Sequence, residues 1–300
     1  MRGKISDVFF KKLNEKRLND AFDLMRKTEA GREALDTIKE MGYDFTFEAG
    51  IGCFGLCDAP NKEIVLSPSM NAEMLAALLP HEIRHAVQLE KDPELIKTSR
   101  MRVGDMFKRM RGMEADACAH QAAFVYEAGK AGATVEMPEE YQSVLDAYSA
   151  EMNKTNNKKQ AMNAAFKAWY KDKRMVNRYD DCYTDAVAAA VNHLINNNRK
   201  DGFTGKETDA RLADLFDYKG EAYVEPEFFS SPEAYHLRPR DKQKIMAEMK
   251  RYSQKTGAPA DTSVLKMADR DQNGKIVQND MKNRKTPALA ALIAAKTKQR

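Results

Sequence analysis

Apolar residues recur at helical spacing along most of this 300-residue chain, and residues 43–67 depart from that pattern. In this stretch Tyr43–Glu48 alternates with the period of a strand, and a short strand is expected at Cys53–Cys57. A third strand, Glu63–Ser67, ends at a proline. Because so short a region can form only a small sheet, we expect an α+β fold that is predominantly α-helical.

Five stretches outside this region have the apolar spacing of amphipathic helices. They are residues 5–41, 71–90, 99–128, 138–198 and 241–254. In the first stretch we expect a break at Gly31 and a helix end at Gly42. Pro80 either kinks the second helix or begins a new segment as its first residue, since an internal proline removes a backbone hydrogen bond.

The composition excludes disordered, collagen-like and membrane-spanning proteins. Hydrophobic residues make up 43% of the chain, enough to build a core, and Gly and Pro are too few for a collagen-like chain. No stretch approaches the roughly 18 apolar residues of a membrane span. The net charge of +4 comes from 49 basic and 45 acidic residues that are largely interspersed, so we expect no nucleic-acid partner.

The cysteines and the N-terminus indicate a cytoplasmic protein. The four cysteines are too few for a disulfide scaffold of this length, and none form a CxxC pair, so we expect reduced thiols. Charges interrupt every apolar run near the N-terminus, which excludes the core of a signal peptide. We expect the protein to be cytoplasmic, or exported without a cleaved signal peptide.

His81-Glu82-Ile83-Arg84-His85 is an HExxH motif within one of the expected helices. Residues four apart differ by about 40° around a helix axis and roughly 6 Å along it, so both imidazoles can bind one Zn²⁺ ion. Glu82 lies about 100° round from His81 and cannot be a ligand beside both histidines. It can instead serve as the general base for a metal-activated water.

A catalytic zinc takes three protein ligands and keeps one position open, so a third ligand must come from another segment. The helix at 99–128 offers Glu114, which shares a face with the small residues Ala117 and Cys118. These small side chains would let the two helices approach closely. His120 lies about 240° round the helix from Glu114, so it could be a ligand only in place of Glu114.

The sequence HEIRHAVQ, followed about 30 residues later by MEADA, resembles the gluzincin type of zinc metallopeptidase. It is most similar to uncharacterised bacterial metallopeptidase families with an HExRHAxQ helix and a downstream ExDA helix. The resemblance covers about residues 44–125 and implies a zincin-like core that acts on a peptide or protein substrate. It implies zinc bound by His81, His85 and Glu114, with Glu82 as the base. It also implies that strand Glu63–Ser67 could pair with an extended peptide.

The chain departs from the gluzincin pattern at one position. Gluzincins often carry an aspartate four residues after the ligand glutamate, where it orients the first histidine. Here that position is Cys118 and the nearby acid is Asp116, so the group that orients His81 stays open. Such enzymes also use a tyrosine or histidine to stabilise the oxyanion. The candidates are Tyr183, His193, Tyr223, Tyr235 and His236.

Residues 269–280, DRDQNGKIVQND, fit an EF-hand calcium loop. The expected calcium ligands are Asp269, Asp271, Asn273, the backbone of Lys275, and Asp280. Asp280 is shorter than the usual glutamate, and an Asp/Asn-rich turn between helices is the alternative. We expect flanking helices at Thr262–Ala268 and Met281–Ala295, and hence an EF-hand-like helix-loop-helix at 256–300 after a zincin-like domain at 1–255.

The sequence therefore predicts a zinc-dependent metallopeptidase that hydrolyses peptide bonds, with calcium as a second metal. The alternative is a non-catalytic interaction protein, such as an effector or a phage-type factor, that zinc or calcium stabilises. Glu82 favours the enzyme, because a purely structural metal site has no use for a general base.

Overall fold

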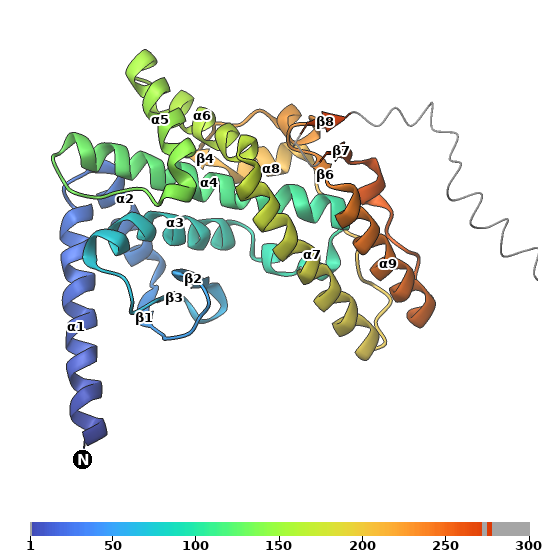
Figure 1. Cartoon of the computed structure of the whole chain (residues 1–300), viewed down its shortest axis with the longest axis horizontal. Helices are drawn as coiled ribbons and strands as arrows, with labels where there is room; N and C mark the ends of the chain where they lie inside the picture. Colours follow the sequence, from blue (N-terminus) through green and yellow to red (C-terminus); the bar gives the residue numbers. More distant parts are fainter. Residues whose placement is uncertain (1, 272–274, 278–300) are drawn as a thin grey trace, which may run out of the picture.

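Helices make up most of the structure, and short strands form small sheets (Figure 1). The computed structural model describes residues 2–271 and 275–277. Within them, the predicted α+β and predominantly helical fold is confirmed. The helices are α1 (Arg2–Met25), α2 (Glu29–Met41), α3 (Ala72–Lys91), α4 (Val103–Lys130), α5 (Gln142–Thr155), α6 (Lys158–Lys171), α7 (Lys173–Asn196), α8 (Asp209–Leu215) and α9 (Pro239–Thr256). The strands are β1 (Asp44–Phe47), β2 (Gly55–Asp58), β3 (Glu63–Leu66), β4 (Asp217–Tyr218), β5 (Glu221–Ala222), β6 (His236–Leu237), β7 (Ala268–Arg270) and β8 (Ile276–Val277).

The sheet that precedes the HExxH segment has the strand order β1-β3-β2. β3 pairs in parallel with β1 and antiparallel with β2, and its Ile64 and Leu66 are fully buried. The strands predicted at Tyr43–Glu48, Cys53–Cys57 and Glu63–Ser67 are therefore confirmed, with small shifts at their ends. The expectation that Glu63–Ser67 pairs with a substrate is wrong, because both edges of this central strand are occupied.

The break between α1 and α2 lies at residues 26–28, and not at Gly31 as predicted. Thr28 caps α2, since its hydroxyl accepts a hydrogen bond from the Gly31 N–H at 2.9 Å. Gly31 therefore lies inside α2, where a Cβ would be 2.1 Å from the carbonyl oxygen of Met25. Gly42 ends α2 with a φ of 71°, as expected for a C-terminal glycine.

The HExxH motif lies in α3, which is one continuous helix. Asn71 caps its start, because the Asn71 side chain accepts the Met74 N–H at 2.8 Å. Pro80 lies inside the helix, so the alternative in which a new segment begins at Pro80 is excluded. Packing of the apolar face of α3 fixes the orientation of the helix and so the direction in which both histidines point. The fully or nearly fully buried residues of this face are Leu75, Ala76, Leu79, Ile83 and Ala86.

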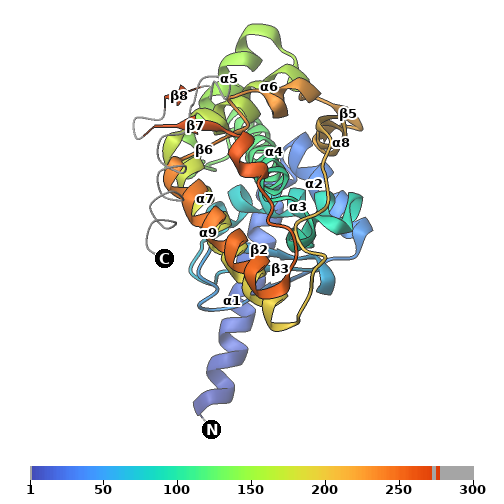
Figure 2. The same cartoon turned by 90° about the vertical axis from the view of Figure 1, so that its right-hand side faces the viewer.

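α4 is the central helix, with α3 on one side and α5 and α6 on another (Figures 1 and 2). It also packs against α2 and α7. Small side chains permit so many neighbours; those without exposed surface are Ala115, Ala117, Cys118, Ala119 and Ala122. The predicted packing of the Glu114 helix against the HExxH helix is therefore confirmed.

α7 and α9 pack side by side, and in Figure 1 they lie on the opposite side of the molecule from α1. Their common core includes Ala258, Val264 and Met267. The helix predicted over Thr262–Ala268 is wrong, because this segment forms a short 3-10 helix, Ser263–Lys266, followed by β7. The β7 backbone pairs with β6 and β8, so its peptide groups bond to neighbouring strands instead of along a helix.

These strands connect the predicted C-terminal unit to the rest of the chain. β6 belongs to the predicted domain 1–255, and β7 and β8 belong to the predicted unit 256–300. The second predicted helix, Met281–Ala295, lies outside the described residues. The division at residue 255 and the EF-hand-like unit therefore stay predictions.

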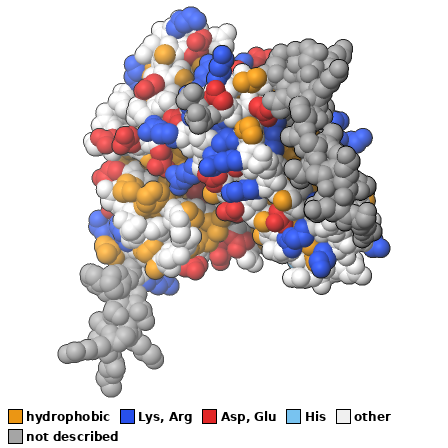
Figure 3. All heavy atoms as spheres, turned by 45° about the vertical axis from the view of Figure 1, so that its right-hand side comes forward, with side chains coloured by type: hydrophobic (Ala, Val, Ile, Leu, Met, Phe, Trp, Pro, Cys, Tyr) orange, Lys and Arg blue, Asp and Glu red, His pale blue; other side chains and the backbone are white. Residues whose placement is uncertain are grey.

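The surface carries both signs of charge. Figure 3 shows Lys and Arg side chains interspersed with Asp and Glu side chains over the visible face. Along the described part of the chain, no helix has the length and apolar character needed to cross a bilayer. The four cysteines are free thiols, as expected.

Candidate metal centre

Three predicted ligands from two helices meet at one point. Nε2 of His81 lies 3.1 Å from Nε2 of His85, one turn further along α3. Oε2 of Glu114 on α4 lies 3.5 Å from the first of these nitrogens and 3.7 Å from the second. Tetrahedral zinc ligands at about 2.0–2.1 Å from the ion lie roughly 3.3 Å from one another. The triangle therefore has the size that such an ion requires.

The electrostatics of this triangle also favour a cation. Oε2 of Glu114 is buried and has no hydrogen-bond partner within the described residues. Burial would raise the pKa of Glu114, but the adjacent imidazoles, above all His85, hold it well below its ordinary value. Burial would likewise lower the pKa of His85, but Glu114 raises it to about 9. Two nitrogens and a carboxylate thus surround a position that attracts positive charge.

Glu82 lies beside this triangle and is itself 5% exposed. Burial raises the pKa of its carboxyl group, although the two neighbouring histidines act in the opposite direction. Strand β2 covers the side chain at Gly55, where a Cβ would lie 2.8 Å from Oε1 of Glu82. The predicted base is therefore enclosed between α3 and the edge strand of the sheet.

The second nitrogen of each histidine has a different neighbour. Nδ1 of His85 lies 2.9 Å from Oε1 of Gln88, whereas Nδ1 of His81 lies 3.7 Å from Sγ of Cys118. Burial raises the pKa of the Cys118 thiol well above its ordinary value, so the thiol is neutral. The group beside His81, which the sequence left open, is thus the uncharged thiol of Cys118.

Two tyrosines that the sequence did not single out lie near the centre. Tyr141, in the 3-10 helix Glu139–Tyr141, has its ring 6.3 Å from the His81 ring. Its hydroxyl oxygen lies 3.4 Å from that of Tyr179 on α7. Burial raises the pKa of both phenols, so both keep their protons. No sequence spacing connects these residues with HExxH, because folding of the chain after α4 brings them there.

Four of the five predicted oxyanion residues make their contacts elsewhere. The Tyr223 hydroxyl donates to Asp116 at 2.5 Å, and the Tyr235 hydroxyl donates to the Ser263 carbonyl at 3.2 Å. His193 lies beside Asn197, and Nδ1 of His236 faces the Pro232 carbonyl. The fifth candidate, Tyr183, packs edge-on against Phe107 and also lies 5.9 Å, ring to ring, from Tyr179, so it borders the two tyrosines near the centre.

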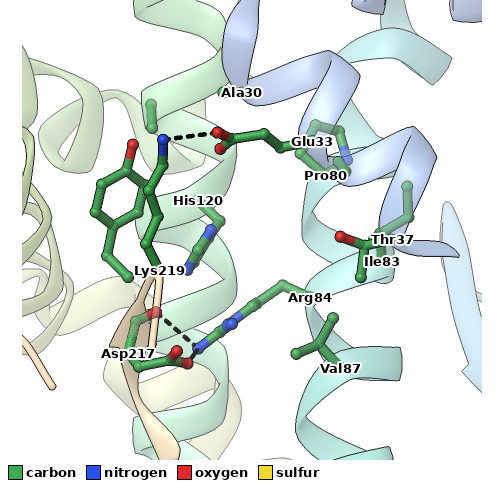
Figure 4. Close-up of a pocket in the computed structure, with 13 residues that line it drawn as sticks. Ala30, Glu33, Thr37, Pro80, Ile83, Arg84, Val87, His120, Asp217 and Lys219 are labelled. Atoms are coloured by element: carbon green, nitrogen blue, oxygen red, sulfur yellow. Dashed lines mark hydrogen bonds and ion pairs between the residues drawn. The ribbon is translucent and has the colours of Figure 1, made fainter. Parts of the chain in front are cut away.

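His120, the alternative third ligand, lines a separate cavity (Figure 4). This cavity has a volume of about 290 Å³ and lies between α2, α3, α4 and the β4–β5 hairpin. Burial and the nearby Arg84 lower the pKa of His120 to about 4, so its imidazole is neutral. The group of metal-ligating side chains in the described residues contains Glu114 and not His120.

The described calcium candidates belong to a strand and a turn. Oδ1 of Asp269 on β7 lies 2.7 Å from Nζ of Lys242. The Asp271 N–H donates to the Lys275 carbonyl at 3.0 Å, the oxygen expected as a calcium ligand. Asn273 and Asp280 lie outside the described residues, so calcium binding stays a prediction.

A family described as "Putative metallopeptidase family (DUF6782)" matches residues 8–200. This range includes α3, α4, both tyrosines and all three predicted zinc ligands. No curated protein and no solved structure matches the chain.

Proposed function

We propose, since the chain belongs to this metallopeptidase family, that it hydrolyses peptide bonds with a zinc ion held by His81, His85 and Glu114. The observation that carries the proposal is the triangle of ligand atoms, with sides of 3.1, 3.5 and 3.7 Å. Two histidines and one glutamate are a ligand set of catalytic zinc sites, which keep a fourth position open.

The elements around the triangle support a zincin-like core of the gluzincin type. A small mixed sheet precedes the HExxH helix, and the third ligand comes from the next long helix. The cysteines do not compete as ligands within this group, because the described cluster consists of nitrogen and oxygen donors.

A bound Zn²⁺ ion supplies positive charge that polarises the substrate carbonyl and lowers the pKa of a water molecule. Glu82 accepts a proton from the attacking water and returns it to the leaving amine. The Glu82 side chain suits this role because it lies next to His81 in the chain and is shielded from bulk water by β2.

Tyr141 is the residue that we assign to the oxyanion. Its ring lies 6.3 Å from the His81 ring, and its half-buried hydroxyl keeps its proton. A donor of this kind stabilises negative charge that develops on the substrate oxygen. Tyr179 positions the Tyr141 hydroxyl through the 3.4 Å contact between their oxygens.

Strand β2 is the element that we assign to the substrate. Among the described strands it pairs with β3 alone, so its other edge can accept an extended peptide. Gly55 brings this edge against Glu82, and the flanking Phe54 and Leu56 are 50% and 51% exposed. A peptide along β2 would therefore lie next to the general base.

Hydrolysis of fluorescein-labelled casein and of a proteome-derived peptide library tests this function. We expect Glu82→Gln to keep its zinc and to lose about 10²-fold or more in hydrolysis rate. Glu90→Gln is the matched control, because Glu90 lies on the same helix and pairs with Lys62 at the surface. A Glu82→Gln protein with wild-type hydrolysis contradicts the assigned base. A wild-type protein that binds zinc and cleaves neither probe favours the non-catalytic interaction protein.

A further inference from the structure

We infer that Gln88 and Asp116 form a buried relay that positions His85 and sets which of its ring nitrogens carries the proton. The inference rests on the proposed zinc site and identifies two residues that hold one of its ligands in position. Gln88 lies one turn after His85 on α3, and Asp116 lies two residues after Glu114 on α4. Both side chains are fully buried.

The orientation of the Gln88 amide follows from its neighbours. Its nitrogen lies 2.6 Å from Oδ2 of Asp116 and 3.0 Å from the carbonyl oxygen of Met113. Both neighbours are oxygens that accept hydrogen bonds, so the amide NH₂ must face them. The amide oxygen of Gln88 is therefore the atom that faces Nδ1 of His85, 2.9 Å away.

This orientation determines the tautomer of His85. An amide oxygen can only accept, so Nδ1 must carry the proton that it donates to Gln88. In the neutral imidazole Nε2 is then free of its proton, with its lone pair directed at the triangle. Histidine ligands need this tautomer, and neighbouring acceptors commonly fix it in this way.

Asp116 is in turn held on both of its oxygens. Oδ2 accepts from Nε of Arg84 at 2.5 Å as well as from Gln88, and Oδ1 accepts from the Tyr223 hydroxyl at 2.5 Å. Nη2 of Arg84 also lies 2.9 Å from Oδ1 of Asp217 (Figure 4). Because Asp116 and its partners Arg84 and Tyr223 are buried, rotation of Gln88 would leave charged or polar groups without hydrogen bonds.

The two histidines therefore depend on different support. His81 has the neutral Cys118 thiol at 3.7 Å, which is a weak partner. His85 has an amide oxygen that two further hydrogen bonds hold in place. The relay thus gives the second histidine a fixed hydrogen-bond acceptor, whereas Nδ1 of the first faces a thiol.

The zinc dissociation constant, measured by competition with a chelator, tests the relay. Gln88→Met keeps the length of the side chain and removes its hydrogen bonds; we expect zinc affinity to fall about 10- to 100-fold. In the zinc-loaded protein, the proton resonance of the His85 Nδ1–H should be lost through exchange with water. Gln121→Met is the matched control, because Gln121 is also fully buried on the packed face of α4 and its amide has no hydrogen-bond partner within the described residues.

A milder variant keeps the test decisive if Gln88→Met does not fold. Tyr223→Phe removes one hydroxyl that donates to Asp116, so we expect a smaller but measurable loss of zinc affinity. Tyr148→Phe is its control, because the buried Tyr148 hydroxyl has no partner among the described residues. Unchanged zinc affinity in a folded Gln88→Met protein overturns the relay and leaves the proposed function standing. If Gln88→Met does not fold, unchanged zinc affinity in Tyr223→Phe has the same consequence. A wild-type protein that binds no zinc overturns the proposed function and the relay with it.

Discussion

Gly55 on β2 lies directly against Glu82 on α3, so close that a Cβ at position 55 would be 2.8 Å from Oε1 and 2.9 Å from Cγ of the glutamate. This contact joins the edge strand to the HExxH helix. A side chain at position 55 would have to displace the carboxylate that we assign as the general base.

Gly55→Ala should therefore reduce hydrolysis more than it reduces stability. We expect a loss of about 10²-fold in kcat, since misplacing a catalytic group by about 1 Å has an effect of that size. Zinc affinity should stay near that of the wild type, because the atoms nearest to a Cβ at position 55 belong to Glu82 and Leu78 and not to a zinc ligand. Gly129→Ala is the control, as nothing lies within 4 Å of a Cβ there. Equal losses of kcat in the two variants would show that Gly55 has no special relation to Glu82.

Tyr141→Phe should lower kcat by about 10²- to 10³-fold, the size of effect expected when one oxyanion donor is removed. Zinc affinity should not change, because the Tyr141 hydroxyl contacts Tyr179 and not a ligand. Tyr126→Phe serves as the control, since its hydroxyl donates to Asn153. Steady-state kinetics of both variants on the same cleaved peptide check this prediction, which fails if Tyr141→Phe keeps the wild-type kcat.

Zinc should stabilise the folded protein, because the triangle exists only in the native state. At a free zinc concentration 100 times the dissociation constant, the gain in free energy of unfolding is about 2.7 kcal/mol. Calorimetry with zinc and with excess chelator should show the corresponding rise in Tm. Glu114→Gln should remove most of this rise, whereas His193→Ala, at a distant exposed histidine on α7, should keep it. A zinc-dependent rise of full size in Glu114→Gln would exclude Glu114 as a ligand.

Asp217 should make the protein sensitive to acid. Burial would raise its pKa, but Arg84 and Lys91 lower it to about 2 from an ordinary value of 3.8. A carboxyl group with a lowered pKa stabilises the fold above its unfolded-state pKa, and this contribution is lost as the pH falls from about 4 to about 2. The difference corresponds to roughly 2 kcal/mol at neutral pH.

Urea unfolding of Asp217→Asn at several pH values tests this expectation. The variant should be less stable than the wild type at pH 7, and the two free energies of unfolding should converge near pH 2. Glu94→Gln is a control in which an exposed carboxylate loses its ion pair with Lys97. A constant difference between Asp217→Asn and wild type from pH 7 to pH 2 would contradict the assigned ion pairs.

The sequence identified the parts of the site that depend on local helical spacing. His81 and His85 lie one turn apart, and Glu114 shares a face with small residues that let α4 pack on α3. These relations follow from helix geometry alone. The three strands before α3 were likewise predictable from their alternating pattern and turn residues.

The parts that depend on tertiary packing were not predictable in this way. Tyr141 lies near the metal centre because the chain turns back after α4. The spacing of residues in the sequence does not predict that turn. The role of Gln88 appears only when α4 brings Asp116 beside it. The start of the predicted calcium loop lies in β7, Ala268–Arg270, because β6 and β8 offer backbone partners that no local spacing indicates.

The metal content of the purified protein tests the central claim most directly. Mass spectrometry under native conditions should find one zinc ion per chain in the wild type and none in a His81→Ala, His85→Ala double variant that circular dichroism shows to be folded. A folded double variant that binds zinc with wild-type stoichiometry, or a wild-type protein that binds no metal, would contradict the proposed centre.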